Sequence, residues 1–368
     1  PTRAKKEQLK HNMLSFIAKK YSTPIVYVNQ VGAIDNSSFD GSSRVFDKNG
    51  KLLARAKSFE EQFLIVNPTK GVGKIYPLTK GLDKSLTEQK VFTLEYESDL
   101  ERTYKTIIQG IRDYFNKCGF KRAVLGLSGG LDSTVCAVLL ADAIGPENVF
   151  GVSMPSHITS KESKTDAEQL ARNLGINFTE ATIRPMIDTT TACLDELFKT
   201  VETKWDGRYK TSFTPDNIQA RSRAMFLWGI SNEFASCIPI ATSDKSELYM
   251  GYATINGDMS GGFAPIADVP KTKLFAFARW MNSNREIKNA IPEAIILKKP
   301  GAELAINPKT GKPLIAEDAL MPYEFLDEII WRLENKNEGY QDLLDTEFVY
   351  EKHNNVSKEQ KIEWLDKF

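Results

Sequence analysis

Three consecutive stretches decide the fold of this chain: Ala123-Val-Leu-Gly-Leu127, Ser128-Gly-Gly-Leu-Asp-Ser133 and Thr134-Val-Cys-Ala-Val-Leu-Leu140. The first pattern predicts a buried strand, the second a glycine-rich turn and the third an apolar helix. The two glycines let successive backbone N–H groups curve around an anion at the positive end of the helix. Ser128 and Ser133 add hydroxyl donors. The segment therefore predicts a phosphate-binding loop, with a capped glycine-rich turn as the structural alternative.

The loop differs from two familiar phosphate-binding patterns. No lysine follows it, as GxxxxGK[ST] would require, and its glycines do not have the GxGxxG spacing. Further strands are predicted at 149–154, 176–181 and 238–242, with helices at 99–117, 133–144, 161–174, 188–200 and 216–235. This alternation predicts an α/β fold, a doubly wound parallel sheet with helices on both faces. A ligand site is expected beyond the carboxyl ends of the strands.

The segment before this domain has a different pattern. A helix is predicted over 2–20, followed by strands at 24–29, 42–46, 52–55 and 61–66, which together form a partial α/β layer. Residues 67–98 contain several prolines and glycines and are expected to be a linker. The predicted division is thus 1–66, a linker over 67–98, and 99–368.

Composition excludes several classes of protein. The 48 basic and 48 acidic side chains cancel, so no overall positive charge attracts nucleic acid or an anionic membrane. Residues 1–90 carry 16 basic and 8 acidic side chains, which we attribute mainly to a solvated lysine-rich helix face. The four cysteines are far apart in sequence, and no apolar run is long enough to span a membrane. We expect a cytoplasmic protein with no membrane or nucleic-acid partner.

The loop Ser128–Ser133 resembles the PP-loop of the ATP pyrophosphatase family, which binds the phosphates of ATP that leave as pyrophosphate. Six further stretches make the chain resemble NAD⁺ synthetases over roughly 98–335: Asp216–Arg223, Thr242–Glu247, Gly251–Phe263, Ala267–Thr272, Gly301–Leu304 and Glu317–Tyr323. Tyr27–Gly32 and Phe39–Ser43 resemble the last part of a nitrilase-type glutaminase domain.

This resemblance implies a two-step reaction. ATP adenylylates the nicotinate carboxylate of deamido-NAD⁺, and ammonia then displaces AMP to give NAD⁺. Charge on the triphosphate and on the departing pyrophosphate must be neutralised, which implies Mg²⁺ and lysines. Family members are homo-oligomers, with dimers formed through the synthetase domain and octamers among glutamine-dependent bacterial members.

The resemblance also assigns site residues. Asp132, Lys245 and Lys271 are expected to be catalytic, and Asp132 and Glu247 to hold the metal. The alternatives are a helix cap for Asp132, a first-turn carboxylate for Glu247 and solvated surface side chains for the lysines. The expected ATP site consists of Gly126, Leu127, Ser128, Gly129, Gly130, Leu131, Asp132, Ser133, Met154 and Thr242. The expected deamido-NAD⁺ site consists of Asn217, Arg221, Glu247, Tyr252, Ala253, Thr254 and Ile255.

Two positions in these sets carry further expectations. Arg221 is four residues after Asn217 and shares its helix face, whereas Arg223 is expected to point elsewhere. Tyr252 is expected to stack on a ring of the dinucleotide, with a core aromatic as the alternative. Asp244, where many relatives have Asn, is expected either to face away from the phosphates or to join the metal ligands.

Residues 1–90 contain no cysteine. A nitrilase-type glutaminase needs a cysteine nucleophile, so we expect that this chain alone does not hydrolyse glutamine and that it is a fragment or a shortened domain. The resemblance would place Lys6 near a glutamine site. Two other readings remain open: a different PP-loop amidotransferase, and a truncated nucleotide-binding subunit without turnover.

Overall fold

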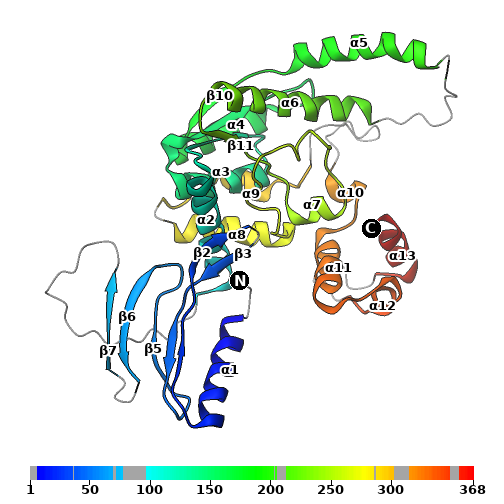
Figure 1. Cartoon of the computed structure of the whole chain (residues 1–368). Helices are drawn as coiled ribbons and strands as arrows, with labels where there is room; N and C mark the ends of the chain where they lie inside the picture. The colour runs from blue at the N-terminus through cyan, green and yellow to red at the C-terminus, as the bar shows by residue number, and fades with distance from the viewer. Residues whose placement is uncertain are drawn as a thin grey trace. The chain divides into compact units, whose positions relative to one another are not determined.

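The computed structural model describes residues 6–35, 37–68, 72–77, 97–202, 204, 213–285, 287–301, 315–348 and 356–368. The chain divides into two compact units, Pro1–Gly119 and Phe120–Phe368. Figure 1 labels their helices and strands.

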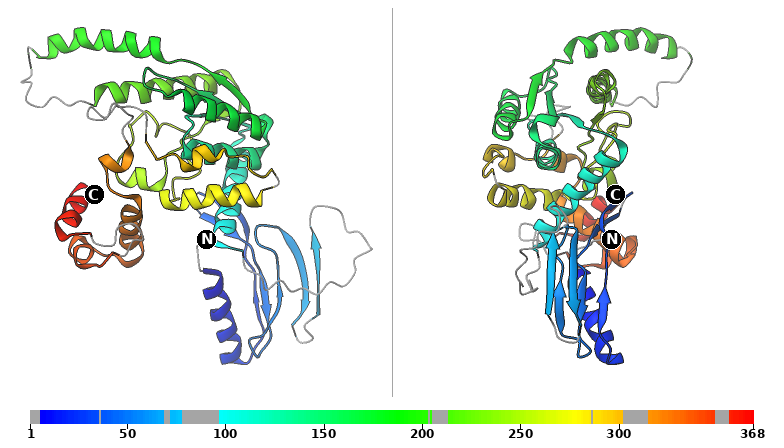
Figure 2. Two further views of the ribbon diagram at one scale, coloured as in Figure 1. Left: turned by 180° about the vertical axis from the view of Figure 1, so that it is seen from behind. Right: turned by 60° about the vertical axis from the view of Figure 1, so that its left-hand side comes forward.

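In the first unit, helix α1 packs on a three-stranded antiparallel sheet. The helix spans Lys6–Tyr21, and the sheet order is β1 (Ile25–Tyr27), β4 (Arg44–Phe46), β5 (Leu52–Arg55). Leu14 and Ala18 of the helix share a core with Phe46 and Leu52 of the sheet. Both views in Figure 2 show the helix alongside these strands.

Two hairpins and a long helix complete the first unit. The hairpins are β2 (Val31–Ile34) with β3 (Ser37–Asp40), and β6 (Gln62–Asn67) with β7 (Val72–Pro77). Neither β2, β3 nor β7 was predicted, and β7 lies inside the stretch expected to be a linker. Helix α2 (Asp99–Cys118) groups with this first unit, although the sequence prediction assigned it to the second.

The β2–β3 hairpin depends on a tertiary partner. Its sequence, Val-Gly-Ala-Ile and Ser-Ser-Phe-Asp, mixes strand-forming valine, isoleucine and phenylalanine with glycine, alanine and aspartate, which strands disfavour. Asp113 of α2 accepts a hydrogen bond from the Ala33 amide at 2.5 Å, and Gln109 donates to the Phe39 carbonyl at 3.1 Å. These bonds come from residues about 70 to 80 positions away, so no local pattern could predict the hairpin.

Apolar side chains remain exposed on this unit. On α1, Leu9, Met13 and Phe16 follow one helix face and are 50–68% exposed, and Val28 after β1 is 79% exposed. An exposed apolar surface of this kind is typical of a face that packs against a partner.

The second unit contains the predicted parallel sheet. Its order is β10 (Asn177–Glu180), β9 (Val149–Ser153), β8 (Arg122–Gly126), β11 (Cys237–Pro239), and all three pairings are parallel. Val124 and Val152 pack against the side of helix α6 (Thr214–Glu233). Neighbouring strand residues face opposite sides, so the buried Ala123 and Leu125 point to the other face. Helices α3 (Leu131–Ile144) and α4 (Lys161–Leu174) contact the sheet and each other.

The remaining helices follow the sheet. A short 3₁₀ turn covers Pro146–Asn148, and α5 covers Arg184–Glu202. The helices after β11 are α7 (Lys245–Tyr249), α8 (Lys271–Asn284), α9 (Glu293–Leu297), α10 (Ala316–Ala319), α11 (Tyr323–Lys336), α12 (Tyr340–Asp345) and α13 (Lys358–Lys367).

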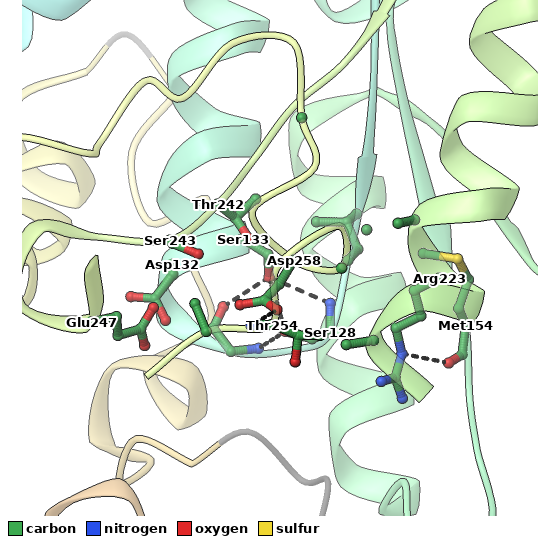
Figure 3. A pocket seen from close by; sticks show the side chains of 18 of the residues that line it. Ser128, Asp132, Ser133, Met154, Arg223, Thr242, Ser243, Glu247, Thr254 and Asp258 are labelled. Carbon is green, nitrogen blue, oxygen red and sulfur yellow. Dashed lines mark hydrogen bonds between the residues drawn. The ribbon is translucent and has the colours of Figure 1, made fainter. Parts of the chain in front are cut away.

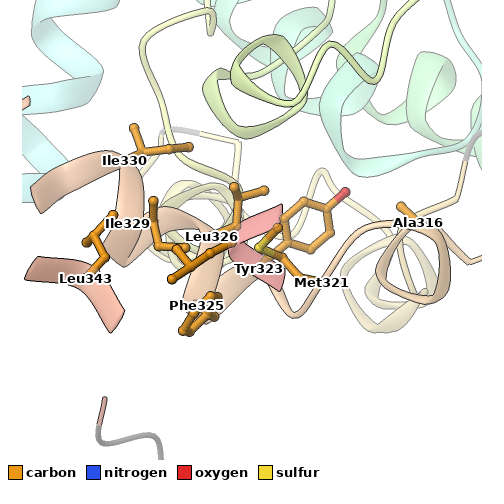
Figure 4. Close-up of a cluster of buried hydrophobic side chains, with 9 residues drawn as sticks. Ala316, Met321, Tyr323, Phe325, Leu326, Ile329, Ile330 and Leu343 are labelled. Carbon is orange, nitrogen blue, oxygen red and sulfur yellow. The ribbon is translucent and has the colours of Figure 1, made fainter. Parts of the chain in front are cut away.

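A separate apolar core holds the last helices together. Phe325, Leu326, Ile329 and Ile330 of α11 pack with Leu343 of α12 (Figure 4), and Leu365 of α13 completes the cluster. Within the described residues, no helix is long and apolar enough to cross a bilayer.

Candidate functional site

A cavity of about 680 Å³ lies where β8, β9 and β11 end, at the edge of the sheet predicted for the ligand site. Figure 3 shows ten of its lining residues by name, among them Ser128, Met154 and Thr242, which follow the three strands. All the expected ATP-binding residues line the cavity except Gly129.

Hydrogen bonds of its own two serines stabilise the glycine-rich loop. The Gly130 amide donates to Ser128 Oγ at 3.1 Å, the two hydroxyls of Ser128 and Ser133 lie 3.1 Å apart, and Ser133 Oγ donates to the Gly130 carbonyl at 3.2 Å. Gly130 caps α3 without a side-chain hydrogen bond. Helix geometry leaves the amides of Leu131, Asp132 and Ser133 without an intrahelical acceptor. Since this helix end borders the cavity, an anion is its fitting ligand.

Gly129 determines the shape of the loop and does not line the cavity. Its φ is +75°, and a Cβ atom built there would lie 2.2 Å from the Ser163 carbonyl oxygen. Only glycine fits this combination of a left-handed backbone and a close backbone contact.

Three carboxylates gather beside the loop. The oxygens of Asp132, Asp244 and Glu247 lie within 4.8 Å of one another. The buried Lys271 contacts all three, with its Nζ 2.7 Å from Asp132, 2.6 Å from Asp244 and 2.9 Å from Glu247. Asp132 therefore does not cap α3. Asp244 belongs to the cluster, which is one of the two positions expected for it. Glu247 is also a first-turn carboxylate of α7.

Burial and like charge change the acidity of this cluster. Burial raises the pKa of Glu247 to about 8, and the charge of Asp132 contributes to the increase. Burial likewise raises the pKa of Asp244 to about 6, opposed by Lys271. Although burial lowers the pKa of Lys271, the carboxylates raise it well above its ordinary value, so the amine stays charged. The fully ionised cluster of three carboxylates and one ammonium has a formal charge of −2.

The cluster fits a divalent cation such as Mg²⁺. Carboxylate oxygens are the ligands this ion prefers, and an ion of charge +2 would neutralise the cluster. The side chains of Asp132 and Glu247 are about a fifth exposed and line the cavity, whereas that of Asp244 is fully buried behind Lys271. Asp132 and Glu247 are thus the pair that can present oxygen atoms to an ion in the cavity (Figure 3).

The side chain of Lys245 does not lie where it was expected. Its Nζ pairs with Asp268 at 2.8 Å and Glu334 at 2.7 Å, and it is not among the residues lining the cavity. Lys245 begins α7 and its side chain leaves the helix on the side of α11, so the structure does not bring it to the phosphate site.

Helix α6 supplies one wall, but not with the expected arginine. The lining positions include Asn217, Ala220, Arg223 and Ala224, whereas Arg221 donates to the Ile255 carbonyl at 3.2 Å. The cavity face centres on Ala220 and Ala224, and Arg221 lies about 90° round the helix from that centre. Arg223 lines the cavity, so the expectation that it points elsewhere was wrong, because Asn217 lies at the edge of the cavity face and not at its centre. Binding of deamido-NAD⁺ by Arg221 stays a prediction.

The loop after α7 forms another wall. Tyr252, Ala253 and Thr254 line the cavity, and Thr254 Oγ1 donates to Asn217 Oδ1 at 2.8 Å. Ile255 does not line it and is 70% exposed. Tyr252 is half-buried and packs against the α11 core, as the core-aromatic alternative has it, and its stacking on a ring of the dinucleotide stays a prediction.

Sequence reasoning missed several cavity residues. Arg223 donates to the Met154 carbonyl at 3.2 Å (Figure 3), and Trp228 donates to the Ser260 carbonyl at 2.6 Å. Asp258 accepts from the Thr254 amide and lies within the Gly251–Phe263 stretch, which was recognised, although this residue was not singled out. Lys298 donates to Ser163 Oγ and lies in none of the recognised stretches. Along α6 the spacing was the available signal, and only the position of the helix shows which side faces the cavity.

Lys6 belongs to the first unit, at the start of α1. It has a partner there, but no described feature assigns it a ligand. Residues 302–314 lie outside the described residues, and they include most of the Gly301–Leu304 motif.

Comparison with known proteins agrees with this geometry. The NAD synthase family model matches residues 103–363. The glutamine-dependent NAD(+) synthetase of Synechocystis sp. is 38% identical over 94% of this chain and 57% of the relative. The enzyme of that name from Thermotoga maritima is 39% identical over 90% of this chain and 58% of the relative. The chain thus spans less than two thirds of these relatives.

A solved structure has a fold similar to that of this chain. The glutamine-dependent NAD+ synthetase of Acinetobacter baumannii, in complex with ADP, superimposes with a TM-score of 0.70 at 31% identity. The match covers 100% of this chain and 60% of that protein.

Proposed function

The chain belongs to the NAD synthase family, and from that premise we propose that it catalyses ATP-dependent amidation of deamido-NAD⁺. The carboxylate of the nicotinate ring attacks the α-phosphorus of ATP, and pyrophosphate leaves. Ammonia then attacks the acyl-adenylate, AMP leaves, and NAD⁺ is formed. The curated relatives are glutamine-dependent NAD(+) synthetases, and the ADP complex of the Acinetobacter baumannii enzyme supports an adenine nucleotide as ligand.

The position of the glycine-rich loop carries the proposal. The α3 amides of Leu131–Ser133 would bind the β,γ-phosphates, while Met154 and Thr242, which line the cavity beyond the strand ends, would border the nucleotide. Asp132 and Glu247 would hold Mg²⁺, which when bound neutralises phosphate charge. Lys271 contacts both carboxylates and so holds them close together.

The opposite walls would hold the dinucleotide. Asn217 and Thr254 are joined by a hydrogen bond, so α6 and the loop after α7 form one continuous surface beside the carboxylates. Glu247, Tyr252 and Ala253 continue it. Such a surface would hold the nicotinate carboxylate near the α-phosphate, which would lower the barrier through proximity.

Several finer statements belong to the same proposal. The synthetase would occupy 99–368, which the family match over 103–363 supports, after a glutaminase-type segment at 1–66 and the connecting 67–98 stretch. Glutamine would supply the ammonia in the whole protein, with Lys6 near its site. Exposed apolar residues on α5 and α6, including Leu197, Phe198 and Met225, support a homo-oligomer formed through the synthetase unit.

A substrate panel tests the function. With ATP, Mg²⁺, ammonium and deamido-NAD⁺, the chain should release pyrophosphate and NAD⁺, and with xanthosine monophosphate or aspartate it should release neither product. Asp132→Ala should abolish the reaction. ATP binding without pyrophosphate release would favour a non-catalytic nucleotide-binding subunit, and turnover of another acceptor would favour a different PP-loop amidotransferase.

A further inference from the structure

Asp327 lies outside the cavity, on α11, yet it connects to α7 and α8, two of the helices that carry the carboxylate and lysine cluster. Its side chain is almost fully buried. One oxygen accepts a hydrogen bond from Ser246 Oγ of α7, and the other accepts from the amide and hydroxyl of Thr272 in α8, at 2.9 and 2.6 Å. A single carboxylate thus joins three helices.

The two helices bound by Asp327 are those that present Glu247 and Lys271. Glu247 is in the first turn of α7, and Lys271 is the first residue of α8. Ser246 Oγ also accepts the Lys271 amide at 2.9 Å, so Ser246 links the two helix starts directly. Movement of either start would change the Lys271–Glu247 contact of 2.9 Å.

Helix α8 lacks a cap of its own. Pro270 precedes it and offers no side-chain hydrogen bond. The amides of Lys271 and Thr272, which helix geometry leaves unsatisfied, are instead bound by Ser246 and Asp327. A negative charge at a helix N-terminus is also favourable. Asp327 therefore caps α8 from another helix.

Helix α11 makes a second contact with the same lysine. The Tyr323 ring lies under Lys271, with Nζ 5.5 Å from its centroid. Tyr323 and Asp327 are four residues apart, on one face of α11. This face therefore supports the carboxylate cluster from behind, while the opposite side of the cluster faces the cavity.

We propose that Asp327 is a positioning residue for the carboxylate and lysine cluster, acting through Ser246 and Thr272. This rests on the function proposed above for the cavity. Asp327 holds the first turns of α7 and α8 together, and so keeps Glu247 and Lys271 where the metal and phosphates require them. Its substitution should lower turnover more than it weakens substrate binding.

Asp327→Asn tests the proposal because it preserves size but not acceptor capacity. The amide group has one oxygen, so it can accept from Ser246 or from Thr272 but not from both. We expect a fall in kcat of about 10- to 100-fold with a smaller change in KM for ATP. Glu328→Gln is the matched control, since the neighbouring Glu328 pairs with Arg332 on the same helix. Equal kcat for these two variants would overturn the proposal.

Smaller changes separate positioning from general stability. Ser246→Ala removes the hydroxyl that binds Asp327 and the Lys271 amide, and Thr272→Val removes one hydroxyl contact to Asp327. Both variants should lower kcat, whereas Ser246→Thr and Thr272→Ser retain the hydroxyls and should keep it. If Asp327→Asn does not fold, these four variants decide the question. Full activity in both Ser246→Ala and Thr272→Val would contradict the proposal.

A structural measurement is independent of turnover. Asp327→Asn should speed hydrogen exchange at the Lys271 and Thr272 amides relative to Glu328→Gln. Unchanged exchange rates at these two amides would refute the proposal that Asp327 caps α8. If the unaltered chain makes no NAD⁺, the proposed function fails while the exchange result still decides whether Asp327 holds these helices.

Discussion

Lys245 and Lys271 each occupy the first residue of a helix, yet their environments differ completely. Lys271 is fully buried among three carboxylates, whereas Lys245 pairs with Asp268, whose side chain is 95% exposed, and with Glu334. Removing one partner of a buried charge cluster leaves the others uncompensated, but a surface pair contributes little. The Lys245 side chain is itself only 12% exposed, so at the scale of the residue the exposure of the partners, rather than residue type, separates the two lysines.

This contrast predicts different costs of substitution. Lys271→Gln should destabilise the second unit by about 3–5 kcal/mol and abolish activity. Lys245→Gln should cost about 1 kcal/mol or less and leave turnover close to that of the unaltered chain. Urea unfolding followed by tryptophan fluorescence, together with pyrophosphate release, measures both. A severe loss of turnover in a folded Lys245→Gln variant would contradict this prediction and support a role for Lys245 at the phosphate site.

Gly129 and Gly130 provide a second contrast between neighbouring residues. At Gly129 a methyl group would meet the Ser163 backbone at 2.2 Å with φ at +75°, whereas at Gly130 the nearest atom is the Ser128 hydroxyl oxygen at 3.1 Å. Gly129→Ala should cost at least about 1–2 kcal/mol from the backbone conformation alone and weaken ATP binding strongly. Gly130→Ala should have the smaller effect on both. Titration calorimetry with ATP and Mg²⁺ compares them, and equal affinities would contradict the argument.

At the scale of the element, α6 shows that helical spacing fixes relative directions but not which direction faces a ligand. Asn217, Ala220 and Ala224 share the cavity face, as spacing allows, and Arg223 reaches the cavity from one flank. Arg221 leaves from the other flank toward Ile255. The packing of Phe226, Leu227 and Ile230 against the sheet sets this rotation of the helix.

The two arginines of α6 should therefore contribute unequally. Arg223→Ala removes a cation from the cavity wall and its hydrogen bond to the Met154 carbonyl, so KM for ATP or deamido-NAD⁺ should rise about tenfold or more. Arg221→Ala should change KM about twofold or less. Steady-state kinetics with each substrate varied in turn provides the measurement. A larger effect at Arg221 would favour the assignment made from spacing.

At the scale of the whole molecule, each unit combines an apolar core with a buried cluster of charges. In the second unit the charges surround Lys271, and a separate charged network lies in the first unit. Its Glu7 lies 2.5 Å from Arg44 and 2.6 Å from Lys10. Although burial raises the pKa of Glu7, the bond to Lys10 and the charge of Arg44 lower it to about 2.

The first unit should consequently be sensitive to acid. The folded-state pKa of Glu7 is below its ordinary value of 4.5, so its stabilisation is complete above pH 4.5 and is lost as the pH falls toward 2. Glu7→Gln should cost about 3 kcal/mol at pH 7, and this difference from the unaltered chain should shrink below pH 4.5.

The distribution of tryptophan allows the two units to be followed separately. All five tryptophans lie beyond residue 119, so their fluorescence reports the second unit, whereas circular dichroism reports both. Glu7→Gln should shift the unfolding seen by circular dichroism at pH 7 and leave the fluorescence transition in place. A pH-independent difference would show that Glu7 is not the titrating group.

Local sequence determined the strand, loop and helix around Ser128–Ser133, the parallel α/β class and the set of residues at the strand ends. These features follow from hydrophobic period and from glycine, which act over a few neighbouring residues. Only the tertiary structure decided the β2–β3 hairpin, the roles of Lys245 and Arg223, and the link from Asp327 to Lys271. Each of these depends on partners distant in sequence, as in the Asp327 contact with Ser246, 81 positions away. Burial, which fixes the strength of a charge contact, exists only once the chain has folded.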